Sequence, residues 1–136
     1  MPCVNPVHAP GVIDPMTWKP FLVVVAILAA YWLVRRLGQI SAKAARAHLL
    51  QGALIVDVRS NAEFQARHLP NAIHIPLDEI DTLTVRRVKD KEKVLLLHCA
   101  SGIRSQVARK RLAALGYRRA FNLGSYSRAE RIVGNK

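Results

Sequence analysis

One cysteine in the C-terminal part of the chain stands where a reactive thiolate is expected. Cys99 follows the apolar run 93–98 and precedes a short loop, after which helical periodicity begins near Arg104. Backbone N–H groups of such a turn, together with the Arg104 charge, favour the thiolate, the nucleophilic form of cysteine. A cysteine that ends a buried strand is more often inert packing, but its Gly, Ser and Arg neighbours favour a reactive site. Contacts to a substrate are expected from Ala100, Ser101, Gly102, Ile103, Arg104 and Ser105.

Asp57 and Arg59 are further candidates for substrate binding, because they stand at the end of a second apolar run, 53–58. The carboxyl ends of neighbouring parallel strands meet at one edge of a sheet, so this pair is expected near Cys99. The favoured interpretation is an ion pair that shapes the rim of the site. His98 is expected on the opposite face of its strand from Cys99, which disfavours it as a base. Three other residues are interpreted as structural: Glu63, His68 and His74.

The elements that must position these residues alternate between helical and extended patterns. Helices are predicted over 41–50, 61–65, 77–88, 104–115 and 125–133, and strands over 53–58, 72–75, 93–98 and 118–123. This alternation predicts a single α/β domain with a central, mostly parallel sheet flanked by helices. In such sheets the functional site lies at the carboxyl ends of the strands.

Five segments of this region, met in a fixed order, resemble a known family. They read LIVDVR at 54–59, HLPNAIHIP at 68–76, CASGIRS at 99–105, LGY at 115–117 and NLG at 122–124. Together they cover most of residues 40–124, and they are similar to the single-domain rhodaneses, a fold of sulfurtransferases. The resemblance implies the rhodanese-like α/β fold for this part of the chain.

The resemblance also implies a mechanism centred on Cys99. The thiolate would take the outer sulfur of thiosulfate or of a persulfide, hold it as a persulfide, and pass it to cyanide or to a thiol, which could belong to a protein. Arg104 would help to hold the anionic donor. Phosphatases of this fold have a loop one residue longer, whereas Cys99 and Arg104 enclose four residues, which favours sulfur. No cofactor is expected, and the five His and two Cys residues show no metal-ligand spacing.

The chain departs from the family pattern at two places. Arg67 and Asn71 stand where the family has glycines, and Ser125 and Tyr126 follow Gly124 in place of a glycine and a tryptophan. The pocket wall on that side is therefore expected to be more open. This leaves an alternative function, in which the domain is a non-catalytic or carrier module that docks on a partner protein at a membrane.

The N-terminal part has a different character. Residues 21–34 contain no charged side chain, and the twenty residues 18–37 approach the length of a membrane-spanning helix, with aromatic residues near the ends. The sequence therefore predicts a disordered extension over 1–17, a transmembrane helix over 18–37 and the rhodanese-like domain over 38–136. A cleaved signal peptide and a soluble or interfacial helix are the alternatives, and Met16 is a possible start.

The charge distribution indicates a topology. The formal net charge is +12, and residues 35–136 hold 20 basic and 8 acidic side chains, whereas residues 1–34 are neutral. Basic residues after an apolar segment predict that the C-terminal domain is cytoplasmic, on a single-pass protein of the inner (plasma) membrane. Nucleic acid is not expected as a partner, because no aromatic residues are interleaved with the basic clusters. The 51% apolar content excludes a disordered chain, and two cysteines exclude a disulfide scaffold.

Overall fold

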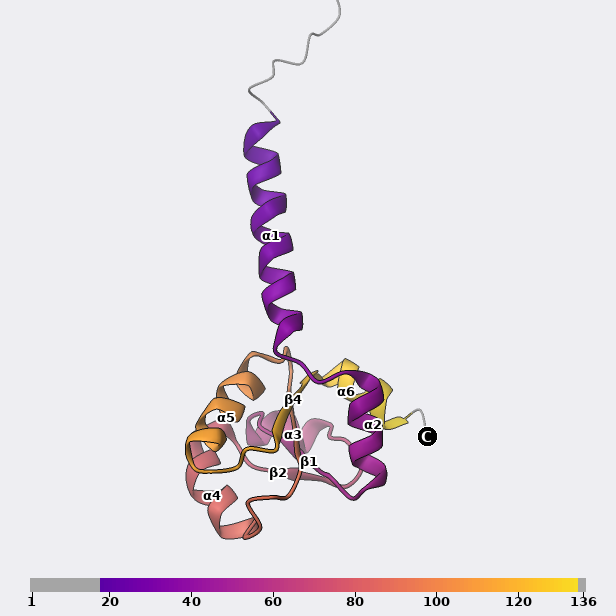
Figure 1. Ribbon diagram of the computed structural model, residues 1–136, viewed down its shortest axis with the longest axis vertical. Helices are drawn as coiled ribbons and strands as arrows, with labels where there is room; N and C mark the ends of the chain where they lie inside the picture. The colour runs from indigo at the N-terminus through magenta and orange to yellow at the C-terminus, as the bar shows by residue number, and fades with distance from the viewer. Residues whose placement is uncertain (1–17, 135–136) are drawn as a thin grey trace, which may run out of the picture. The chain divides into compact units, whose positions relative to one another are not determined.

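The computed structural model describes residues 18–134 and divides the chain into two compact units, 1–34 and 35–136. The elements are α1 (Lys19–Leu37), α2 (Ala42–Leu50), β1 (Leu54–Asp57), α3 (Asn61–Ala66), β2 (Ala72–His74), the 3-10 helix η1 (Leu77–Glu79), α4 (Ile80–Arg87), β3 (Leu95–Cys99), α5 (Ile103–Ala114), β4 (Ala120–Ser125) and α6 (Tyr126–Gly134). Figure 1 shows their arrangement in each unit.

The described part of the N-terminal unit is formed almost entirely by helix α1, whose last turn extends beyond residue 34. Its large apolar side chains are solvent-exposed, with Phe21 67% and Val34 72% accessible. Within residues 18–134 no helix combines the length and the apolar character needed to cross a bilayer. The predicted transmembrane helix over 18–37 is therefore not supported, although the segment is helical. Its uncharged stretch spans about 21 Å at 1.5 Å per residue, against about 30 Å of hydrocarbon. The predicted disorder of 1–17 lies outside the described residues.

The C-terminal unit is built on a four-stranded sheet in the order β2-β1-β3-β4, and all three strand pairings are parallel. Helices α4 and α5 contribute Ile80, Ala108 and Leu112 to the core on one face of this sheet. Helices α2 and α6 contribute Ala45 and Ile132 to the core on the other face. The predicted α/β domain with a parallel sheet flanked by helices is confirmed (Figure 1).

Strand β3 shows how the two faces receive different side chains. Leu95, Leu97 and Cys99 pack into the core under α4 and α5, whereas Leu96 packs into the core under α2 and α6. This two-residue alternation places the ring of His98 on the face opposite the Cys99 sulfur, as the sequence predicts.

Local signals in the sequence explain most of the helix boundaries. Ser41 caps α2 by accepting a hydrogen bond from the Ala44 N–H at 3.2 Å, and Ser60 forms a capping box with Glu63 at the start of α3. The helix predicted over 77–88 is instead divided into η1 and α4. On α5, Ala108 and Leu112 are fully buried, whereas Val107 is 39% exposed.

Candidate active site

The Cys99 sulfur lies at the carboxyl end of β3, facing the start of α5. Gly102 is the N-cap residue of α5, and its φ of 95° turns its N–H toward the Cys99 Sγ at 3.0 Å. A Cβ on Gly102 would lie 3.3 Å from the backbone of Gly124, so a side chain there would be conformationally strained and tightly packed. The turn between β3 and α5 therefore aims backbone donors at the sulfur, as the loop sequence predicts.

The electrostatics around Cys99 favour its ionised form. Burial alone would raise the pKa of the thiol, but the N–H and hydroxyl of Ser105 and the N–H groups of Gly102 and Ser101 lower it. The net effect is a pKa below the ordinary thiol value, which is typical of a nucleophilic cysteine. The side chain is fully buried, so a donor reaches the sulfur only when the residues around it shift.

A buried asparagine supports the loop from the neighbouring strand. The Asn122 Oδ1 accepts a hydrogen bond from the Ser105 Oγ at 2.7 Å, and the Asn122 Nδ2 donates to the Gly102 carbonyl at 3.1 Å. The Ser105 Oγ also lies 3.7 Å from the Cys99 Sγ. Asn122 therefore holds two of the three residues whose donors face the sulfur. Sequence reasoning did not identify it, although a polar residue within the apolar run 120–123 was a visible signal.

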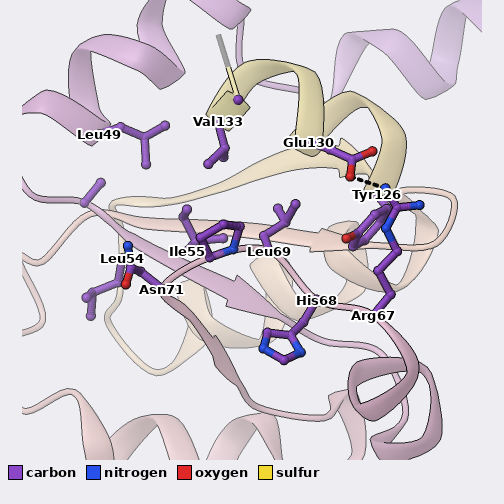
Figure 2. Close-up of a pocket in the computed structure, with 13 residues that line it drawn as sticks. Leu49, Leu54, Ile55, Arg67, His68, Leu69, Asn71, Tyr126, Glu130 and Val133 are labelled. Atoms are coloured by element: carbon purple, nitrogen blue, oxygen red, sulfur yellow. Dashed lines mark hydrogen bonds and ion pairs between the residues drawn. The ribbon is translucent and has the colours of Figure 1, made fainter. Parts of the chain in front are cut away.

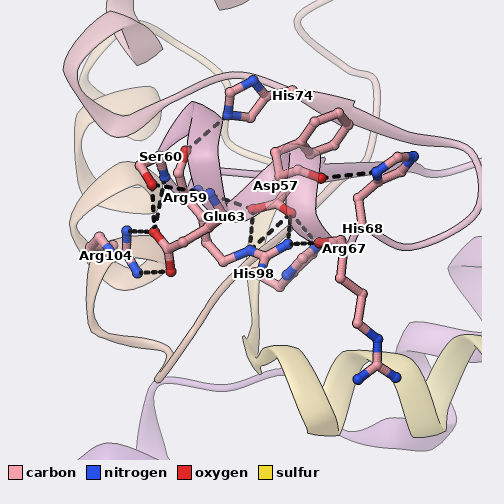
Figure 3. A network of polar contacts seen from close by, with 10 residues as sticks. Asp57, Arg59, Ser60, Glu63, Arg67, His68, His74, His98 and Arg104 are labelled. Carbon is pink, nitrogen blue, oxygen red and sulfur yellow. Dashed lines mark hydrogen bonds and ion pairs between the residues drawn. The ribbon is translucent and has the colours of Figure 1, made fainter.

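Arg104 is held by a carboxylate in this structure. Its Nη1 and Nη2 donate to the two oxygens of Glu63 at 2.7 and 2.9 Å, and the Glu63 Oε2 also accepts from the Ser60 N–H (Figure 3). The hydrogen bonds from Arg104 are the main cause that lowers the pKa of Glu63 to about 2. The hydrogen bond to Glu63 is the main cause that raises the pKa of Arg104, and the negative charge of Cys99 raises it further. Glu63 therefore positions the arginine that the sequence assigns to the donor anion.

Asp57 and Arg59 form a buried ion pair, with the Arg59 Nη2 and the Asp57 Oδ2 2.7 Å apart. The Arg59 Nη2 also donates to the Arg67 carbonyl, and its guanidinium stacks over the Tyr126 ring at 4.5 Å. The strand alternation places Asp57 on the α2 and α6 face, away from the Cys99 sulfur. The contacts of this pair are those of the predicted structural ion pair (Figure 3).

Three histidines, namely His68, His74 and His98, lie around this ion pair together with Phe64 (Figure 3). The His74 Nε2 lies 2.9 Å from the Arg59 carbonyl, and the Phe64 ring stacks between His68 and His74. His98 is fully buried 3.8 Å from Asp57, and burial lowers its pKa to about 4. His98 is therefore neutral near pH 7 and does not face the sulfur.

A cavity of about 610 Å³ lies between α2, α6 and the loop that precedes β2 (Figure 2). Leu49, Ile55 and Val133 form part of its apolar lining, and Tyr126 lies at one end. The Tyr126 ring is flanked by the guanidinium of Arg59 and by that of Arg67, 5.1 Å from the ring centre. None of the residues of the Cys99 loop lines this cavity, so it is separate from the sulfur site. Among residues 18–134 no cluster of His, Cys, Asp or Glu side chains could hold a metal ion.

Comparison with known proteins gives a consistent assignment. A family model described as Rhodanese-like domain matches residues 41–129. The thiosulfate sulfurtransferase PspE of Escherichia coli (strain K12) is 33% identical over 69 residues, which are 51% of this chain and 66% of PspE, just under two thirds of its length.

Two solved structures share the fold. A rhodanese from E. coli, described with anions, has a TM-score of 0.55 and 30% identity over 57% of this chain and 91% of its own. The human single-domain sulfurtransferase TSTD1 has a TM-score of 0.59 and 26% identity over 69% of this chain and 96% of its own. With a matching fold, a cysteine at the end of β3 and a family model over residues 41–129, this chain belongs to the rhodanese-like domain family.

Proposed function

We propose that the protein is a sulfurtransferase that moves sulfane sulfur through a persulfide on Cys99. The observation that carries this proposal is the cradle around the Cys99 Sγ, in which the Gly102 N–H lies at 3.0 Å and neighbouring donors lower the pKa of the thiol. The names of PspE and TSTD1 support the same reaction class.

The first half-reaction loads the cysteine. The Cys99 thiolate attacks the outer sulfur of thiosulfate, a new S–S bond forms, and the S–S bond of the donor breaks as sulfite leaves with its electron pair. The persulfide carries one negative charge, which the N–H groups of Gly102 and Ser101 and the Ser105 hydroxyl are placed to stabilise. Arg104, held by Glu63, supplies positive charge for the anionic donor.

The second half-reaction unloads the cysteine. An acceptor thiolate or cyanide attacks the outer sulfur of the persulfide, the S–S bond to Cys99 breaks, and the Cys99 thiolate is restored. The cycle needs neither a metal nor an external oxidant. In each step the sulfane sulfur passes from a leaving group to a nucleophile, so no electrons are gained or lost overall. A persulfide donor would load Cys99 in the same way, with a thiolate as the leaving group.

Thiocyanate formation from thiosulfate and cyanide tests the activity, with Cys99→Ser as the control. The proposal expects turnover by the native chain and none by Cys99→Ser, and equal rates for the two would contradict it. The alternative is a carrier module, which holds sulfur on Cys99 and passes it only to a partner protein. Mass measurement after exposure to thiosulfate identifies a carrier if one sulfur atom is gained without turnover.

Helix α1 is the part of the chain that we place against a membrane. It exposes a continuous apolar surface that includes Val24 and Leu28, and Arg35 and Arg36 follow its uncharged stretch. These basic residues would be attracted to the anionic lipids of the cytoplasmic leaflet, so we propose that the C-terminal unit lies at the cytoplasmic face of the plasma membrane. Flotation of the full chain with phosphatidylcholine vesicles tests the contact. Val24→Asp should reduce flotation, whereas Val85→Asp, at an exposed valine of α4, should not.

A further inference from the structure

Three arginines from two helices meet at a pocket on the α2 and α6 side of the domain. Helices α2 and α6 pack beside each other (Figure 1) and enclose a volume of about 490 Å³. The pocket is lined by Ala42, Arg46, Arg128, Arg131, Ile132 and Gly134. Half of its lining residues are therefore positively charged, and none is acidic.

The guanidinium groups of these arginines are held by backbone carbonyls. Arg46 donates to the Ile132 carbonyl at 3.5 Å, Arg131 to the Ser127 carbonyl at 3.3 Å, and Arg128 to the Ile40 carbonyl at 2.7 Å. Within the described part of the chain, no carboxylate lies within ion-pair distance of any of the three.

The acidic residue of α6 does not compensate this charge. Glu130 forms its ion pair with Arg67, on the side of the other cavity. Burial lowers the pKa of Arg128, and the charges of Arg131 and Arg36 lower it further. The pocket therefore concentrates positive charge that the fold leaves without a carboxylate, and an anion bound there would relieve the repulsion.

The position of the pocket close to helix α1 in the sequence indicates which kind of anion would bind there. The Ile40 carbonyl that Arg128 binds is three residues beyond Leu37, the last residue of α1, so the chain between them spans at most about 11 Å. Helix α1 is the apolar segment assigned above to a membrane, and lipid headgroups would surround its basic end. We propose that the pocket of Arg46, Arg128 and Arg131 binds the phosphate of an anionic phospholipid headgroup, a proposal that rests on the membrane contact of α1.

Vesicle binding by the full chain tests this site. Partition is measured on vesicles of phosphatidylcholine alone and of phosphatidylcholine with phosphatidylglycerol, for the native chain and two double variants. Arg46→Gln with Arg131→Gln removes two charges from the pocket and leaves Arg128 to hold its carbonyls. Arg86→Gln with Arg118→Gln removes two charges from exposed positions outside it. Neither pair belongs to the Cys99 machinery, so sulfur transfer in both variants reports that the domain is folded.

The expected result is stronger binding of the native chain to the anionic vesicles, reduced about 25-fold in the pocket variant, at about fivefold for each charge. The control variant should lose clearly less. Equal losses in the two variants would indicate general surface charge and overturn the proposal. Native binding that is the same on both vesicle types would overturn the site but leave the membrane contact of α1 intact.

Two further outcomes separate this site from its alternatives. Absence of native binding to either vesicle type would refute the membrane contact and, with it, the headgroup site, while leaving sulfur transfer unaffected. Calorimetric titration of the vesicle-free chain with inorganic phosphate tests whether the pocket binds free phosphate in place of the phosphate of a lipid. Phosphate binding as tight as vesicle binding would assign the pocket to a free anion and overturn the lipid proposal.

Discussion

The Arg104 guanidinium and the Glu63 carboxylate form a two-point ion pair, with N–O distances of 2.7 and 2.9 Å across 41 positions of sequence. The capping box of α3 fixes Glu63, because the Ser60 N–H and hydroxyl both donate to its Oε2. The arginine that we propose for the donor anion is therefore oriented by a helix that contributes nothing to the hydrogen bonds around the Cys99 sulfur. Such orientation matters in catalysis because a displaced charge stabilises an anion less well.

Glu63→Gln should lower kcat/KM for thiosulfate about tenfold, the loss of roughly one charged hydrogen bond. The amide retains the shape of the side chain, but its NH2 group replaces one of the two oxygens that accept from Arg104. The effect should fall on the first half-reaction, measured by stopped-flow loading of Cys99, and spare transfer to cyanide. Glu79→Gln is the matched control, because Glu79 is exposed on η1. If the two variants load equally fast, Glu63 does not position Arg104.

The reactivity of Cys99 should extend to lower pH than that of an ordinary thiol. Its pKa is lowered despite burial, so the thiolate persists as the pH falls and alkylation slows only below the usual thiol range. Ser105→Ala removes one donor to the sulfur and should move the midpoint of the alkylation rate to higher pH. Ser127→Ala, at an exposed serine of α6, should leave the midpoint in place. Unchanged midpoints in both variants would refute the role of the Ser105 hydroxyl.

Gly102→Ala should abolish most sulfur transfer while costing about 1–2 kcal/mol of stability. The φ of 95° disfavours a side chain, and the new Cβ would press on the Gly124 backbone and displace the N–H that faces the sulfur. Gly52→Ala is the control, since its φ is 83° and its Cβ would meet only Lys93 Nζ at 4.0 Å. Thermal unfolding and turnover of both variants separate backbone strain from loop geometry. Equal residual activity would contradict the loop's role.

The buried His98 should make folding stability depend on pH below neutrality. Its pKa is about 4 in the folded protein, against 6.5 for an unperturbed histidine, so the unfolded chain binds the proton more readily. The free energy of unfolding should therefore fall as the pH decreases from 6.5 to 4, by about 3 kcal/mol from this group. Urea titrations across this range should show the slope reduced in His98→Leu and retained in His68→Leu. A slope unchanged by His98→Leu would show that another group is responsible.

Much of the fold was predictable from the sequence because its signals are local. Continuous apolar runs predicted buried parallel strands, and Ser41 marked the start of α2 through a hydrogen bond within one helical turn. Cys99 and its loop were equally visible, because a strand end, a glycine and a helix start are adjacent in the chain. The predicted membrane-spanning helix over 18–37 is not supported, because no helix within residues 18–134 is both long and apolar enough to cross a membrane.

The partners within the site could not be read in the same way, because they come from segments distant in sequence. Glu63 was interpreted as structural, and only the packing of α3 beside the loop places its carboxylate on Arg104. Asn122 supports the Cys99 loop from a strand 17 positions beyond Ser105. The sequence by itself determined most of the elements, their order and the candidate nucleophile, since these depend on periodicity and on neighbouring residues. The tertiary structure alone decided which charges and donors face the sulfur, because side-chain contacts across the sheet depend on strand register and helix packing.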